Sequence, residues 1–133
     1  MIHPQLLQDC HHLGRLASGE LLLNRNAALP WFILVPETTL QDVLDLPRDS
    51  LAAVISDCQR LSVFLKKELG YDKVNFAGLG NVVPQMHLHV IARSETDACW
   101  PQPVWGHLSE HRAYDDAVLE EWRGLLSTGY GLA

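Results

Sequence analysis

The sequence predicts an α+β fold in which an antiparallel sheet is covered by helices on one face. Several short strand-like segments occur in succession, a long helical segment separates the second from the third, and 47% of the 133 residues are apolar. This order favours helices packed on an antiparallel sheet, and parallel βαβ winding is the less favoured alternative. A chain of this length is expected to form one domain, residues 1–133, around one core.

The first part of the chain predicts one short helix and two paired strands. Apolar residues near helical spacing in HPQLLQDCHHLGRL predict an N-terminal helix, with Pro4 in its first turn. The runs LLLNRN and WFILVP are separated by the breaker AALP, which predicts two neighbouring strands. A helical turn or two is expected within residues 39–46, ended by Pro47.

The longest predicted helix begins at Asp49 or Ser50, both of which are suitable caps, and ends at Gly70. Its apolar residues follow a 3.6-residue period over about twenty positions. They are Leu51, Val54, Ile55, Cys58, Leu61, Leu65 and Leu69. Two further apolar residues, Val63 and Phe64, lie off this stripe and are expected to be exposed.

The last part of the chain predicts two more strands and a final helix. DKVNFAGL and QMHLHVIAR are strand-like, and the intervening GNVVP is a loop in which Gly80 supplies turn freedom. CWPQPVWGH is an aromatic segment broken by prolines, and residues Asp115 to Leu126 predict a helix.

Composition excludes several classes of function. The net charge is -6 and the longest basic run is Lys66 and Lys67, so no surface for a nucleic-acid polymer is expected, although a small anionic ligand stays possible. Three widely spaced cysteines without a CxxC pattern argue against disulfides and favour a reducing cytoplasm. No leader or membrane-spanning segment is recognised, so no membrane partner is expected.

The QMHLHVIAR strand carries the main candidate site. Side chains two apart on a strand share a face, so Gln85, His87 and His89 are expected to point the same way. The apolar residues between them are expected to face the helices and are Met86, Leu88 and Val90. The polar face is either simply solvated, a metal chelate, or a binding site. Zinc normally takes three or four protein ligands and no other histidine lies at a fitting spacing, so no metal is expected.

The motif resembles that of the histidine-triad (HIT) nucleotide hydrolases and transferases, His-φ-His-φ-His-φ-φ with φ apolar. The stretch Gln85-Met86-His87-Leu88-His89-Val90-Ile91 fits at every position except the first. LLLNRNAALPWFILVP is similar to the paired strands of this family, VNFAGLGNVVP to its phosphate loop, and WPQPVW to a Trp-Pro segment of some branches. The resemblance covers about Gly19 to Trp105 and implies a HIT-like sheet of about five strands with one long helix and shorter helices.

The resemblance implies a role for each matching residue. His87 takes the position of the nucleophile that attacks the α-phosphorus, with its second ring nitrogen held by the backbone carbonyl of His89. The His89 side chain would donate to phosphate oxygens. Asn24 takes a ribose-contacting position, and Asn75 and Asn81 take phosphate-contacting positions. The plain alternatives are a strand-end amide for Asn24 and turn residues for Asn75 and Asn81.

Two positions depart from the family pattern. Gln85 replaces the first triad histidine, and Trp31 stands where relatives often carry another histidine that the resemblance places near the first. Because glutamine cannot transfer a proton near neutral pH, Gln85 cannot protonate the leaving group. The implied activity is hydrolysis or transfer at the α-phosphate of a purine nucleotide or another nucleoside phosphate derivative, without a cofactor. The alternative is a nucleotide-binding or interaction module without turnover.

The resemblance also implies a homodimer whose sheets join edge to edge beside the long helix. Exposed apolar residues and an open strand edge are liabilities that association relieves. The motif itself specifies neither the base nor the leaving group.

Overall fold

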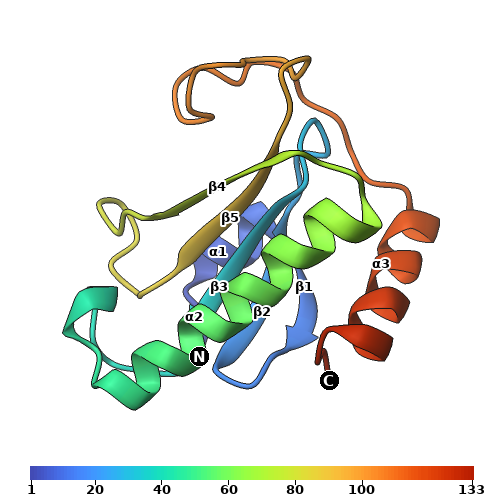
Figure 1. The fold of residues 1–133 in the computed structure, drawn as a ribbon. Coiled ribbons are helices and arrows are strands. Elements are labelled where there is room, and N and C mark those ends of the chain that lie inside the picture. Colours follow the sequence, from blue (N-terminus) through green and yellow to red (C-terminus); the bar gives the residue numbers. More distant parts are fainter.

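The protein forms a five-stranded antiparallel sheet with the strand order β1-β2-β3-β5-β4 (Figure 1). The structure is a computed structural model that describes residues 1–133. The strands are β1 Cys10–Arg15, β2 Gly19–Asn24, β3 Trp31–Pro36, β4 Lys73–Gly78 and β5 Leu88–Arg93. The helices are α1 Pro4–Asp9, α2 Arg48–Val63 and α3 Asp116–Gly129. The predicted α+β class and the five-stranded sheet are confirmed, and the parallel alternative is wrong.

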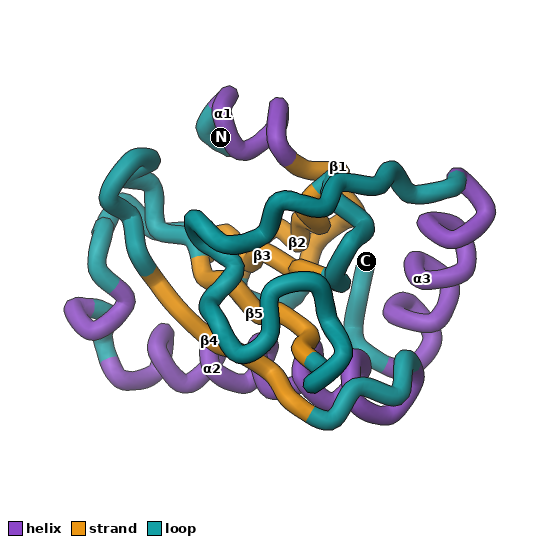
Figure 2. The backbone as a smooth tube through the Cα atoms, turned by 90° about the horizontal axis from the view of Figure 1, so that it is seen from above, coloured by secondary structure: helices purple, strands orange, loops and turns teal.

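Helices cover both faces of the sheet, and not one face as the sequence predicts. The main core lies between the sheet and α2 with α3, and contains apolar side chains from all three, including Phe32, Leu61 and Trp122. The shorter α1 packs on the opposite face, where Leu6 contacts the apolar residues Leu22 and Ile33 (Figure 2). The α1 face is therefore covered by a helix of only six residues. No helix is long and apolar enough to cross a bilayer.

The N-terminal helix is shorter than the sequence predicts. It ends at Asp9, and the residues from Cys10 onward form the edge strand β1 against β2. The spacing of Cys10 and Leu13 looks helical, but both residues lie on a strand and point to opposite faces of the sheet. Cys10 packs with Leu6 on the α1 face, and Leu13 packs in the main core on the other face. A register shift between His12 and Gly14 accompanies this arrangement.

The long helix is confirmed, with different ends. It begins at Arg48 with Pro47 at the N-cap, so neither Asp49 nor Ser50 caps it with a side chain. A wider π-helical turn, Phe64–Glu68, continues it, and Gly70 ends it with a positive φ of 77°. The turn expected before α2 is the short 3₁₀ helix Val43–Asp45.

The expectation that Phe64 is exposed is wrong. Phe64 is fully buried, and its ring makes edge contacts with Phe32, Trp122 and Tyr130 at centroid distances of 5.3–6.2 Å. Phe64 lies off the apolar stripe predicted from the sequence. It is buried because α3 packs on a second side of the continuous helix formed by residues 48–68. Val63 is 49% exposed, as expected.

The strand of the histidine motif begins later than predicted, at Leu88, so Gln85 and His87 precede it. The alternation nevertheless holds on the apolar side, where Met86, Leu88 and Val90 all join the main core. The loop between β4 and β5 turns at Gly80, whose φ of 68° favours glycine.

Candidate active site

A cleft of about 490 Å³ lies on the α1 side of the sheet, within the size range of small-molecule sites. It is built by α1, by residues of all the strands except β4, by the β4–β5 loop, and by the loop that follows β5. Its lining residues are Gln5, Leu6, Asp9, Cys10, Asn24, Trp31, Ile33, Leu79, Gly80, Asn81, Val82, Val83, His87, His89 and Trp105. Of the residues predicted from the sequence, it brings together His87, His89, Asn24 and Asn81.

His87 is 92% buried, and a backbone carbonyl fixes its ring. Its Nδ1 lies 2.7 Å from the carbonyl oxygen of Gln85. Because a carbonyl can only accept, Nδ1 carries the proton and the neutral ring keeps a lone pair on Nε2. The expectation that the carbonyl of His89 plays this part is wrong, since His89 lies inside β5, where the backbone pairs with β3 and β4.

His89 is held in the opposite tautomer. The indole Nε1 of Trp31 donates to His89 Nδ1 at 2.9 Å, and an indole N–H can only donate. The proton of a neutral His89 therefore lies on Nε2. The His87 and His89 rings are 5.1 Å apart between centroids and meet edge to face, so the two imidazoles are direct neighbours in the cleft.

Burial keeps His89 uncharged. The residue is 95% buried, and the centroid of its ring lies 5.8 Å from that of Trp31 and 5.0 Å from that of Trp105. Burial, with a smaller effect of the nearby His87 charge, lowers the pKa of His89 from 6.5 to about 4. At neutral pH, His89 is thus a hydrogen-bond donor and carries no charge.

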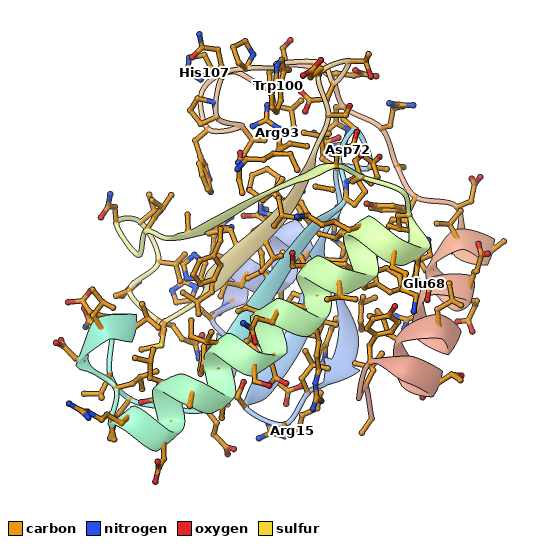
Figure 3. All side chains as sticks on the ribbon, viewed as in Figure 1. Arg15, Glu68, Asp72, Arg93, Trp100 and His107 are labelled. Atoms are coloured by element: carbon orange, nitrogen blue, oxygen red, sulfur yellow. The ribbon has the colours of Figure 1, made fainter.

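The loop that carries Trp105 is anchored by a buried ion pair. Arg93, at the end of β5, is 99% buried and contacts Asp97 at 2.8 Å, the Gln102 carbonyl at 2.7 Å and the face of Trp100. Figure 3 shows Arg93 below Trp100 in the upper part of the view, where this loop lies. Burial alone would raise the pKa of Asp97, but hydrogen bonds, foremost from Arg93, lower it overall.

Asn75 belongs to this anchor and does not line the cleft. Its side-chain oxygen accepts from Nη1 of Arg93 at 2.9 Å. By contrast, Asn24 and Asn81 line the cleft. The side-chain oxygen of Asn24 accepts from the backbone N–H of Asn26 at 2.9 Å. The amide NH₂ of Asn24 donates to no group of the protein.

Gln85 and Trp31 are not neighbours, so the expected pair does not form. Trp31 pairs with Ile91 in the sheet, whereas Gln85 lies beyond the Leu34–Leu88 pair at the other end of this ladder. The side chain of Gln85 points to the N-terminal segment, where it accepts from the His3 amide at 2.7 Å and donates to the Met1 carbonyl at 2.8 Å.

Several lining residues were missed by sequence reasoning. The α1 residues Gln5, Leu6 and Asp9 reach the cleft only because α1 crosses the sheet face, a packing that helical periodicity does not specify. Trp31 was recognised as a departure, but its bond to His89 connects residues 58 positions apart. No group of three or more His, Cys, Asp or Glu side chains is placed to hold a metal ion.

Comparison with known proteins agrees with this geometry. Residues 8–96 match the model of the HIT domain family. The chain is 35% identical to a histidine triad protein from Bradyrhizobium japonicum, with a TM-score of 0.87 over 96% of this chain and 95% of that one. It is 34% identical to a histidine triad protein from Marinobacter aquaeolei, with a TM-score of 0.86 over 95% and 92%.

A third solved structure, a histidine triad protein from Sinorhizobium meliloti, is 30% identical with a TM-score of 0.87 over 96% of this chain and 94% of that one. A comparison with curated proteins gave no match. The match to the HIT domain covers most of the chain, and the solved relatives cover nearly all of it. This chain therefore belongs to the HIT family, whose members bind nucleotide derivatives.

Proposed function

We propose that this protein is a nucleotidyl hydrolase or transferase that acts at the α-phosphate of a nucleoside phosphate derivative, with His87 as the nucleophile. The hydrogen bond from His87 to the Gln85 carbonyl carries this proposal, because it leaves a lone pair on a ring that lines the cleft. Asn24 and Asn81 supply amide groups in the same cleft for the ribose and phosphate.

The proposed reaction has two displacements. The Nε2 lone pair of His87 bonds to the α-phosphorus while the leaving group departs with the electrons of its bond. The positive charge on the nucleotidylated ring is stabilised by the Nδ1–H bond to the Gln85 carbonyl. Water or another acceptor then attacks the phosphorus, and the bond to Nε2 breaks, which returns the neutral ring.

His89 is proposed to stabilise charge and not to transfer a proton. Its Nε2–H can donate to the phosphate oxygens as negative charge spreads over them. A neutral imidazole N–H and the amide of Gln85 are not acids near neutral pH. The site therefore favours leaving groups that depart as stable anions, such as phosphate, or that take a proton from water, such as an amine.

The absence of a general acid at positions 85 and 31 favours a second candidate, a nucleotide-binding module without turnover. Neither Gln85 nor Trp31 titrates, and burial keeps His89 neutral while its Nδ1 accepts from Trp31. A site without an acid can bind the phosphate well and release the leaving group slowly.

The test compares two variants on an adenosine or guanosine phosphoramidate and on a nucleoside diphosphate. Replacing His87 with Ala is expected to abolish release of nucleoside monophosphate. Replacing His89 with Ala is expected to lower the rate by roughly a hundredfold, the usual cost of one charge-stabilising donor. A wild-type protein that binds nucleotides without turning any over would favour the binding module. Variants equal to the wild type in both affinity and turnover would refute both candidates.

We further propose that the protein is a homodimer joined along β4 and α2. β4 is an edge strand, and its Phe76 is 50% exposed next to an open groove of about 270 Å³ between β4 and α2. Val63 of α2 is also exposed, and it is close in sequence to Gln59 and Ser62, which line the groove. An unpaired strand edge with apolar side chains favours association.

A further inference from the structure

The side chain of Gln85 has a definite structural role at the position where the family motif has its first histidine. We infer that Gln85 is a positioning residue that clamps α1 in place as one wall of the nucleotide cleft. The nature of the ligand rests on the proposed function, whereas the clamp itself rests only on contacts within the protein.

The clamp uses both ends of one amide group. Oε1 of Gln85 accepts from the backbone N–H of His3 at 2.7 Å, and Nε2 donates to the backbone carbonyl of Met1 at 2.8 Å. A primary amide presents an acceptor and a donor side by side, which matches backbone groups two residues apart. The two nitrogens of an imidazole point away from each other, so a histidine at this position cannot bind both groups.

The clamp acts at the start of α1. His3 is the N-cap residue, and its Nδ1 accepts from the Gln5 amide at 3.0 Å. α1 has only six residues, and a helix this short is not stable without tertiary contacts. Its main contacts are the burial of Leu6 at its centre, the continuation into β1 at its end, and Gln85 at its start.

The position of α1 decides the shape of the cleft. Gln5, Leu6 and Asp9 project from it into the cavity that also contains His87. Loss of the clamp would free the first turn and open this wall, so nucleotide affinity would fall. The ring of His87 would keep its orientation, because it is held by the backbone carbonyl of Gln85, which every variant at this position retains.

The test measures hydrogen exchange, affinity and turnover on the same variants. Gln85→Ala removes both bonds, and Gln85→His replaces the amide with the family residue. Gln102→Ala is a matched control, since this exposed glutamine makes no side-chain hydrogen bond and its backbone carbonyl contact to Arg93 is retained. Exchange is followed by mass spectrometry on the peptide that covers residues 1–9, without any nucleotide.

The clamp predicts faster exchange of residues 1–9 by about fivefold or more in both Gln85 variants and no change in the control. In Gln85→Ala, the Kd and KM for adenosine monophosphate derivatives should rise roughly three- to tenfold, with kcat at saturation unchanged. Unchanged exchange in Gln85→Ala would overturn the clamp. A fall in kcat with unchanged KM would also overturn it, because the side chain would then act in the chemistry. If the wild type binds no nucleotide, the proposed function fails, while the exchange result still decides the clamp.

Discussion

The burial of His89 predicts a specific loss of stability in mild acid. Its pKa is about 4 in the folded protein and near 6.5 when unfolded. As the pH falls below 6.5, the unfolded chain takes up the proton first, so the folded state loses stability between pH 6.5 and pH 4. At about 1.4 kcal/mol per pKa unit the whole effect is roughly 3 kcal/mol, of which about 2 kcal/mol falls between pH 7 and pH 5.

Urea unfolding of the wild type and of His89→Gln at pH 7 and pH 5 measures this effect. The wild type should lose about 2 kcal/mol more than the variant over this interval. His11, whose pKa is also lowered, chiefly by burial, contributes equally to both proteins and cancels in the comparison. Parallel losses in the two proteins would refute the conclusion that His89 is neutral because it is buried.

The Trp31 contact can be tested on the same residue by nitrogen NMR of the imidazole. The wild type should show an unprotonated Nδ1 and a protonated Nε2 on His89 at pH 7. Trp31→Phe keeps an aromatic ring but removes the donor, and it should raise the pKa of His89 by up to about one unit, the equivalent of one neutral hydrogen bond. A wild-type His89 protonated at Nδ1 would contradict the assigned tautomer.

Three further predictions concern the loop anchor, the assembly and metal. Arg93→Met should lower the free energy of unfolding by about 3–5 kcal/mol in urea titrations, since it leaves Asp97 buried without its partner, and adding Asp97→Leu should recover part of the loss. Light scattering at micromolar concentration should give the mass of two protomers for the wild type and of one for Phe76→Glu, and a wild-type mass of one protomer would count against the dimer. Elemental analysis after extensive dialysis should find no stoichiometric zinc, and stoichiometric zinc would revive the chelate interpretation.

Much of the fold could be predicted because most segments have one clear period. The 3.6-residue repeat predicts α2, and the short β-rich runs predict β2 and β3. β1 could not be predicted, because Cys10 and Leu13 point to opposite faces of a strand with an irregular register and so imitate helical spacing. The burial of Phe64 depends on α3, which packs on the helix from 52 or more residues further along the chain.

From local sequence patterns alone, the site was predictable only where its residues are close in sequence. Period-two alternation correctly predicts that His87 and His89 lie together, and the family resemblance predicts that Asn24 and Asn81 join them. The hydrogen-bond partners that orient the His89 ring and the Gln85 side chain come from distant parts of the sequence. The donor to His89 is 58 residues away, and the groups bound by Gln85 are 82 and 84 residues away, so no local pattern contains them.

The role of His87 as the nucleophile is tested most directly by looking for a covalent bond between nucleotide and protein. The protein is mixed with excess adenosine phosphoramidate, quenched within one turnover in alkaline denaturant, digested and analysed by mass spectrometry. A nucleoside monophosphate adduct is expected on His87 and none in His87→Asn, because only the wild-type ring has its Nε2 lone pair free in the cleft. Wild-type turnover in His87→Asn, or an adduct on a different residue, would contradict this role.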